Sequence, residues 1–234
     1  MEEHAVQHGG NKSDTSVRRV VIAIDGPSAS GKGTIASALA SSLGFVHLDT
    51  GMLYRIFAAE IMDKYAPTLS GNMAIAMDHV DKEKMLSLLK VSNRAKYSTE
   101  SVSRAASIVA RNPSVRLALL KIQREFICSS ERGVVLDGRD VSTVVCLDAD
   151  VKIFVTAHAS ERARRRLKQL WLYGNANRVM YKNAFYRLLE RDIRDSCRKS
   201  APLRRAQEAI YLNNSNTSME KSLQLLMKKI KTFL

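Results

Sequence analysis

Short apolar runs alternate along the chain with longer stretches in which apolar residues recur at helical spacing. The short runs are rich in valine and isoleucine and have the length of buried strands. They cover Val20–Asp25, Phe45–Asp49, Val134–Asp137, Val151–Val155 and Ile210–Leu212. Because helix-like stretches separate the runs, the strands are expected to pair in parallel, with helices on both faces. The pattern therefore predicts an α/β fold built on a doubly wound, five-stranded parallel sheet.

Helical spacing and boundary residues define the segments between the strands. Helices are expected over Ile35–Leu43, Met52–Lys64, Met73–Leu89, Ser101–Arg111, Ser114–Ser130, Ser160–Tyr173 and Val179–Arg198. Pro113 suits the first turn of a helix, and Thr217 and Glu220 have the spacing of a capping box before a terminal helix. A loop is expected at 66–72 and a break at 174–177. Residues 90–100 are polar and show no strand alternation.

A glycine-rich segment follows the first predicted strand directly. It consists of Gly26, Pro27, Ser28, Ala29, Ser30, Gly31, Lys32, Gly33 and Thr34. Strand, glycine-rich loop and helix are the context that a phosphate-binding loop requires. The glycines let successive backbone N–H groups point inward, and the helix start and Lys32 add positive charge. The segment therefore predicts binding of a nucleoside triphosphate.

The loop departs from the general pattern after its lysine. The Ser or Thr that normally follows is Gly33, and the hydroxyl is displaced to Thr34. This variant resembles small nucleotide kinases rather than GTPases or motor ATPases. A Mg²⁺ ion would then be coordinated mostly by phosphate oxygens and water. Asp137 follows three apolar residues and fits a carboxylate that reaches Mg²⁺ through water; the alternative is a simple cap or turn residue.

Length and composition limit the class of protein. With 234 residues, 45% of them hydrophobic, the chain suits one α/β domain with a small insertion. The net charge of +14 points to nucleic acid, an anionic membrane surface or a highly phosphorylated substrate. No apolar run has the length of a membrane span, and the three cysteines lack metal or redox spacing, which indicates free thiols in a reducing cytoplasm. Residues 1–17 are polar and are expected to form a disordered tail.

Polar residues end four of the predicted strands, where ligands bind in an open parallel sheet. They are Asp25-Gly26, Asp49-Thr50-Gly51, Asp137-Gly138-Arg139-Asp140 and Thr156. One aspartate after a strand is often only a helix cap, but its coincidence with a phosphate loop favours a functional site. His47, His79 and His158 are isolated in the sequence, and we expect none of them to be catalytic.

Arginines dominate the last third of the chain. Arg162, Arg164, Arg165 and Arg166 crowd one predicted helix, and Arg187, Arg191, Arg194 and Arg198 share one face of the next. Like charges on one helix face repel each other, and a bound polyphosphate would relieve that repulsion. A solvated basic face or an RNA-binding stripe is the alternative. Aromatic residues make up only 6% of the chain and arginine outnumbers lysine here, so we favour phosphate binding.

Five segments together resemble bacterial-type cytidylate kinases. They are Gly26–Thr34, Leu48–Arg55, Ser103–Arg116, Leu136–Val145 and Glu190–Leu203. The most specific are the Asp-Gly-Arg-Asp run at 137–140 and the Arg-Asp-Ile-Arg-Asp run at 191–195. The resemblance spans residues 18–232. It implies a P-loop kinase with a small helical insertion for the nucleoside monophosphate at about 52–113 and an arginine-rich lid at about 160–180.

The resemblance also implies a role for each matching residue. Catalysis by charge neutralisation would fall to Lys32, Arg139, Arg162, Arg166 and Arg198, and residues 26–34 would bind ATP. The CMP site would comprise Thr50, Arg55, Ser107, Arg116, Arg139, Asp140, Arg191, Asp195 and Arg198. Within it, the side chains of Ser107, Arg116 and Asp140 would bind the base, because a carboxylate suits the exocyclic amine of cytosine.

The implied activity is Mg²⁺-assisted transfer of a phosphoryl group from ATP to CMP or dCMP. We expect a cytoplasmic monomer without a membrane or nucleic-acid partner. A related kinase acting on UMP or AMP, and a basic P-loop protein that binds RNA, are the alternatives. Two segments depart from the family pattern: residues 90–100 lack the strands expected in the insertion, and Asn213 and Asn214 replace a run that usually has Asp near the ATP base.

Overall fold

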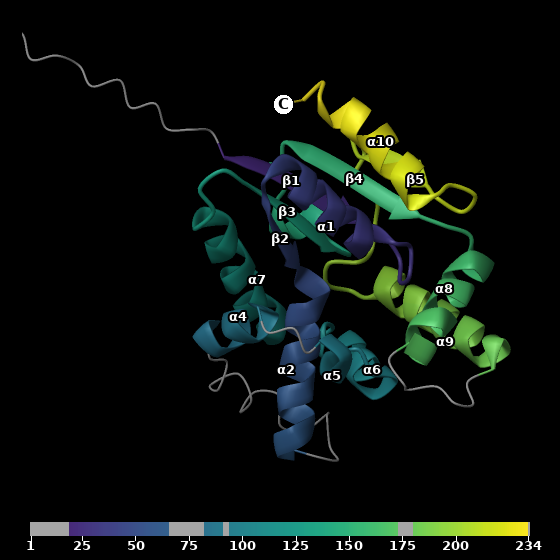
Figure 1. Ribbon diagram of the computed structural model, residues 1–234. Helices are drawn as coiled ribbons and strands as arrows, with labels where there is room; N and C mark the ends of the chain where they lie inside the picture. The colour runs from purple at the N-terminus through teal and green to yellow at the C-terminus, as the bar shows by residue number, and fades with distance from the viewer. Residues whose placement is uncertain (1–18, 66–81, 91–93, 173–179, 234) are drawn as a thin grey trace, which may run out of the picture.

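The computed structural model describes residues 19–65, 82–90, 94–172 and 180–233. Five parallel strands form one sheet in the order β2-β3-β1-β4-β5 (Figure 1). The strands are β1 (Val20–Asp25), β2 (Val46–Asp49), β3 (Gly133–Gly138), β4 (Val151–Thr156) and β5 (Ile210–Asn213). The predicted five-stranded parallel sheet is therefore confirmed. The predictions for residues 1–17, 66–72 and 174–177, for His79 and for the 73–81 part of the helix expected over Met73–Leu89 lie outside the described residues.

Helices connect the strands, and most lie close to the predicted positions. They are α1 (Lys32–Leu43), α2 (Thr50–Tyr65), α4 (Lys82–Lys90), α5 (Arg94–Tyr97), α6 (Glu100–Val109), α7 (Pro113–Cys128), α8 (Ala159–Leu172), α9 (Tyr181–Cys197) and α10 (Met219–Ile230). A single π-helical turn, η1 (Val141–Val145), follows β3 and was not predicted. Helix α1 begins three residues earlier than expected, because the end of the glycine-rich loop is already its first turn.

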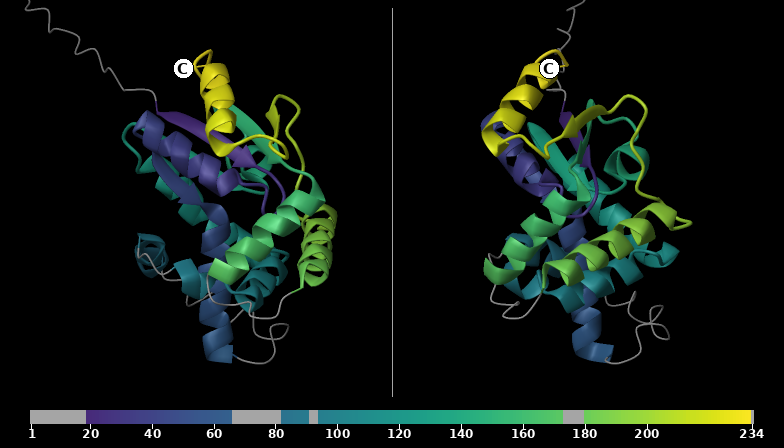
Figure 2. Two further views of the ribbon diagram at one scale, coloured as in Figure 1. Left: turned by 45° about the vertical axis from the view of Figure 1, so that its right-hand side comes forward. Right: turned by 90° about the vertical axis from the view of Figure 1, so that its right-hand side faces the viewer.

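Successive side chains of the strands belong alternately to two separate apolar clusters. In β1, Ile22 and Ile24 pack with α1 and α10, whereas Ala23 packs with α2, α6 and α7. Successive strand residues point to opposite faces, so the two clusters lie on opposite sides of the sheet. Figure 2 shows α1 and α10 on one side of the strands. The doubly wound arrangement is thereby confirmed.

The cap of α7 agrees with the prediction from the sequence, and the cap of α10 differs from it. Asn112 caps α7, its side chain accepting bonds from the N–H groups of Ser114 and Val115, with Pro113 in the first turn as predicted. The capping box from Thr217 is wrong by one residue. Ser218 is the cap of α10 and accepts from the Lys221 N–H. Starting there directs Leu226 and Ile230 of α10 into the core.

Two helical groups project from the carboxyl ends of the strands. Helices α2, α4, α5 and α6 form one group, and α8 and α9, which pack against each other, form the second (Figures 1 and 2). No strand occurs in residues 82–90 or 94–113, which agrees with the absence of strand alternation in the sequence there. Among the described helices, none is long and apolar enough to cross a membrane.

Candidate functional site

The glycine-rich loop connects β1 to α1 at the centre of the sheet. A Cβ atom on Gly26 would lie 2.0 Å from the Val155 carbonyl oxygen, so only glycine fits beside β4 at this point. Gly31 has a φ of 87° and forms the cap of α1. The loop therefore reaches the helix start with its N–H groups free of helical partners, which is the arrangement that binds phosphate.

Lys32 carries the mobile charge of the loop and is buried. Its Nζ donates to the Pro27 carbonyl oxygen at 3.4 Å. Burial and the nearby Arg139 guanidinium lower the pKa of Lys32 to about 7, against a partial opposing effect of Asp137 and Asp49. An anionic ligand at this position would favour the protonated lysine and be held by it.

A cavity of about 290 Å³ opens in front of the loop, at the carboxyl ends of β1 and β3. Most of the predicted residues line it. They are Ser28, Ala29, Ser30, Gly31, Lys32, Gly33, Thr34, Thr50, Arg55, Ser107, Asp137, Arg139, Asp140, Arg166, Arg191, Asp195 and Arg198. Gly26, Pro27, Arg116 and Arg162 are not part of this lining. Segments that are up to 170 residues apart in the sequence thus meet at one strand edge.

Asp140 stands at the centre of one charged cluster in the wall of this cavity. Arg116 of α7 contacts one carboxylate oxygen, and the Nη2 atom of Arg198 donates to the other at 3.1 Å. All three residues are buried. The ring of Tyr54, which also lines the cavity, lies 5.8 Å from the Arg116 guanidinium carbon. Arg116 therefore belongs to the site through Asp140 rather than through the cavity itself.

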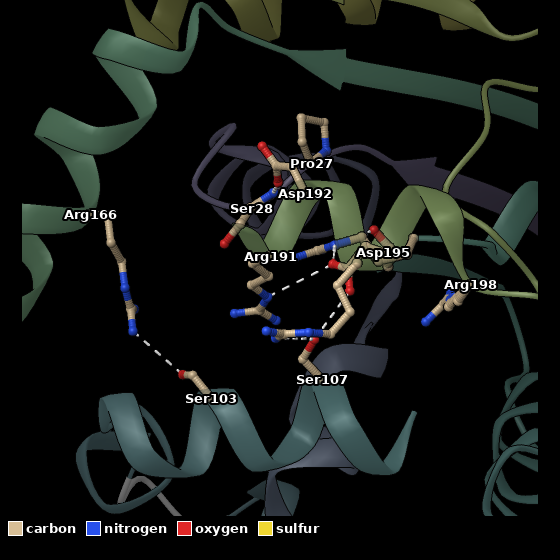
Figure 3. A network of polar contacts seen from close by, with 12 residues as sticks. Pro27, Ser28, Ser103, Ser107, Arg166, Arg191, Asp192, Asp195 and Arg198 are labelled. Carbon is tan, nitrogen blue, oxygen red and sulfur yellow. Dashed lines mark hydrogen bonds and ion pairs between the residues drawn. The ribbon is translucent and has the colours of Figure 1, made fainter. Parts of the chain in front are cut away.

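Asp195 organises a second cluster between α6 and α9 (Figure 3). Its carboxylate accepts from Arg139 Nε at 3.0 Å and from the Ser107 hydroxyl at 3.4 Å, and Arg191 Nε lies 3.8 Å away. The arginines lower the pKa of this carboxyl even though burial opposes them. Arg194 also donates to the Ser107 hydroxyl, at 3.2 Å.

Arginines without enough carboxylate partners give the cavity a cationic wall. Burial, followed by repulsion from Arg139, lowers the pKa of Arg191 to about 9. Burial and Arg55 lower the pKa of Arg166 to about 10, and Arg166 Nη2 reaches the Ser103 hydroxyl of α6 at 3.4 Å (Figure 3). Both guanidinium groups still carry their charge near neutral pH, and an anion in the cavity would offset the cost of burying that charge.

The predicted lid arginine Arg162 lies behind the phosphate loop. Its guanidinium donates to the Ala157 and Ser28 carbonyl oxygens at 2.9 and 3.2 Å and pairs with Asp192 of α9. Asp192 in turn accepts from the Ser28 N–H at 3.3 Å (Figure 3). Neither Arg162 nor Asp192 lines the cavity. Asp192 belongs to the 191–195 run, but the sequence could not reveal its pairing with Arg162, which is 30 residues away on another helix.

Asp137 is held by His47, a residue for which we expected no catalytic role. His47 Nε2 lies 2.8 Å from Asp137 Oδ1, on neighbouring strands of the sheet. A Cβ atom on Gly33 would lie 3.5 Å from the other carboxylate oxygen, so Asp137 faces the phosphate loop. His47 is a supporting residue of this carboxylate. Strand register, which the sequence does not reveal, is what brings the two together.

Asp25 ties the loop to the segment that carries Arg139 and Asp140. Its fully buried carboxylate accepts from the N–H groups of Val141 and Ser142, both at 2.8 Å, and from the Ser142 hydroxyl at 2.5 Å. Burial raises the pKa of Asp25 to about 6. The π-helical turn η1 is therefore capped from β1, and both charged residues before it are held at the cavity.

Comparisons with known proteins agree with this geometry. The family model of cytidylate kinase matches residues 22–232. The chain is 42% identical over 207 residues to a cytidylate kinase of Granulibacter bethesdensis, covering 88% of this chain and 94% of that protein. It is 44% identical over 204 residues to a cytidylate kinase of Rhizobium meliloti, covering 87% and 92%.

Solved structures share the fold. A protein of Eubacterium ventriosum described as uncharacterized superimposes with a TM-score of 0.54 at 12% identity, covering 92% of this chain and 99% of that one. TT1252 from Thermus thermophilus gives 0.51 at 18% identity, covering 92% and 98%. These likenesses concern the fold alone. The family model and the sequence identities decide the family: this chain belongs to the cytidylate kinase family.

Proposed function

We propose that this protein transfers the γ-phosphoryl group of ATP to CMP or dCMP, forming CDP or dCDP. The observation that carries the proposal is Asp140, a buried carboxylate fixed by two arginines in the wall of the cavity that the phosphate loop opens into. The relatives named cytidylate kinase support the same reaction.

The base-binding role of Asp140 follows from its hydrogen-bonding chemistry. A carboxylate only accepts hydrogen bonds, and cytosine offers an exocyclic amine where uracil has a carbonyl oxygen. Arg116 and Arg198 each contact one oxygen of the Asp140 carboxylate, which keeps lone pairs for a further donor. UMP would place its carbonyl oxygen against these lone pairs and be rejected.

The remaining acceptor residues divide between the sugar and the phosphate. Arg191 and Asp195 form the charged pair suited to a ribose, and Ser107, assigned to the base, donates to Asp195 beside them. Thr50 is fixed by its hydroxyl, which donates to the Asp137 carbonyl oxygen at 2.8 Å at the start of α2. Arg55 and Arg139 face the same cavity and supply charge for the monophosphate.

The reaction needs charge and alignment more than proton transfer. An oxygen of the CMP phosphate, already anionic, attacks the γ-phosphorus of ATP while the bond to the β–γ bridging oxygen breaks and ADP leaves. Lys32, Arg139, Arg166 and Arg198 line the cavity and would stabilise the charge on the transferred group. Arg162 supports the loop from behind in this conformation.

The carboxylates present fit a loosely held magnesium ion. Asp137 and Asp49 both line the cavity beside the loop, yet among the described residues no group of three or more His, Cys, Asp or Glu gathers as a metal site. Bound with ATP, Mg²⁺ would neutralise phosphate charge, held by phosphate oxygens and water that Asp137 could accept from.

Two parts of the chain are assigned by position. Residues of about 52–113 would form the insertion that binds the monophosphate, and those of about 160–180 the lid. The contact between Arg166 of α8 and Ser103 of α6, which joins the two segments, supports this division. The cytoplasmic location and the monomeric state stay predictions from the sequence.

A coupled assay of ATP consumption tests the proposal, with Mg²⁺ and separately CMP, dCMP, UMP, AMP and GMP. We expect strong preference for CMP and dCMP. The Lys32→Met variant measures the background of contaminating kinases. Comparable turnover of UMP would contradict the role of Asp140. No turnover with any acceptor, together with salt-sensitive RNA binding, would favour the RNA-binding alternative.

A further inference from the structure

The outer side of the phosphate loop is held by side chains that do not line the cavity. The Ser30 carbonyl oxygen accepts from Arg165 Nη1 at 3.3 Å and from Asn214 Nδ2 at 2.9 Å. These donors come from α8 and from the residue after β5, 135 and 184 residues further along the chain. Two side chains therefore bind one carbonyl oxygen of the loop, and direct binding of phosphate by arginine does not explain these two bonds.

Arg165 and Asn214 also bind each other. Arg165 Nη1 donates to the Asn214 side-chain oxygen and Nη2 to its carbonyl oxygen, both at 2.9 Å. Glu161 holds the Nε atom from the same helix at 2.9 Å. Asn214 is 2% exposed. The side-chain oxygen of Asn214 thus accepts from Arg165, and its side-chain nitrogen donates to the Ser30 carbonyl oxygen.

Peptide geometry connects these contacts to the cavity. The C=O of Ser30 and the N–H of Gly31 belong to one planar trans peptide unit and point in opposite directions. Fixing the Ser30 carbonyl oxygen on the outer side therefore fixes the Gly31 N–H toward the inner side. Arg162 acts in the same way on the Ser28 carbonyl, whose peptide carries the Ala29 N–H. Ala29 and Gly31, which follow, both have positive φ, as in an anion-binding concavity.

We propose that Arg165 and Asn214 are positioning residues that set the donor-binding shape of the phosphate loop without touching the nucleotide. This inference deepens the proposed function and takes from it only that ATP is the ligand of the loop. It assigns a role to Asn214, where the sequence departs from the family pattern, and to one arginine of a crowded helix.

Neighbouring residues of the same type provide matched controls. Arg164 belongs to the same helix and also pairs with Glu161, but its side chain is 71% exposed. Asn213 precedes Asn214, and its side-chain oxygen accepts only from Ser215 among the bonds of the described chain. Each control variant removes the same type of charge or changes the same type of amide, at a residue that does not bind the Ser30 carbonyl oxygen.

Calorimetric binding of an ATP analogue with an imido bridge between the β and γ phosphates provides the first test. Arg165→Met is expected to weaken the analogue on the order of tenfold, because a charge-assisted bond to the loop is lost, and to leave CMP within about twofold. Arg164→Met is expected to leave both within about twofold. Equal weakening in the two variants would assign the effect to net charge and overturn the proposal.

Asn214→Asp separates positioning from direct contact. The aspartate keeps an acceptor for Arg165 but turns a second oxygen toward the Ser30 carbonyl, so analogue binding should weaken on the order of tenfold. Hydrogen exchange of the 26–34 segment should become faster, while Asn213→Asp leaves both measurements unchanged. If Arg165→Met weakens the analogue but Asn214→Asp changes neither binding nor exchange, Arg165 contacts the nucleotide directly and the proposal is wrong.

These readouts do not depend on the acceptor. A wild-type protein that fails to phosphorylate CMP would refute the proposed function, and the differences in analogue affinity and loop exchange would still decide the role of Arg165 and Asn214.

Discussion

The two sides of the cavity differ in the chemical groups that they offer to a phosphate. The donor side, residues 26–34, offers backbone N–H groups and one lysine, while its arginines stand behind the loop. The acceptor side offers side chains from α2, α6, α9 and the turn after β3, and its arginines face the cavity. A backbone surface binds any triphosphate tail, whereas side chains can distinguish one base from another. Selectivity should therefore reside on the acceptor side and general phosphate affinity on the donor side.

Removing the donor-side charge gives the largest expected effect. Lys32→Met should lower turnover roughly 10³-fold, because a preorganised charge at the transferred phosphoryl group is lost. Binding of CMP should stay within about twofold if the two sides act separately. Steady-state kinetics and CMP calorimetry measure this, with the exposed Lys121→Met as the control. A comparable loss of CMP affinity would show that the division is wrong.

Neutralising Asp140 should alter selectivity rather than phosphate chemistry. Asp140→Asn is expected to lower the ratio of kcat/KM for CMP over UMP about 10²-fold, since the amide can donate to the uracil carbonyl. The KM for ATP should change little. Asp148→Asn, on an exposed residue after η1, is the control. An unchanged CMP:UMP ratio would remove Asp140 from base recognition.

The protonation of Lys32 should make the affinity for ATP depend on pH, a smaller effect that changes gradually. The pKa of free Lys32 is about 7, and bound phosphates favour the protonated lysine, so ATP binding takes up a proton above that pH. The Kd for ATP should therefore rise up to about tenfold per pH unit above pH 7 and be flat well below it. Calorimetry between pH 6 and 8.5 tests this. In Lys32→Arg the charge persists and the slope should vanish; an identical slope there would assign the proton elsewhere.

Backbone strain in the donor loop gives the smallest expected effect. Ala29 has a φ of 56°, a left-handed conformation that glycine adopts without strain. Ala29→Gly should raise the free energy of unfolding by about 1 kcal/mol. The same change at Ala38, inside α1, should lower it by a similar amount. Urea denaturation of both variants measures the pair, and a loss of stability at position 29 would contradict the strain.

The sequence predicted the sheet and the phosphate loop because those signals are local, whereas the cavity residues of α2, α6 and α9 were expected from the resemblance to cytidylate kinases. Apolar runs identified each strand, and the loop and the 137–140 run are contiguous motifs. The supporting contacts were invisible for the opposite reason. His47 meets Asp137 through strand register, Arg165 meets Asn214 across 49 residues, and Asp25 meets Ser142 across 117. No periodicity encodes such pairs.

The carboxylate of Asp25 connects the strand before the phosphate loop to the turn that carries the acceptor-side residues. It sits at the last residue of β1, one position before the loop, and fixes the turn that carries Arg139 and Asp140. The backbone of the turn that carries Arg139 and Asp140 is thus tied to the end of β1. Movement of α8 and α9 would carry Arg166, Arg191 and Asp195 with it, whereas Arg139 and Asp140 would keep their place beside the phosphate loop.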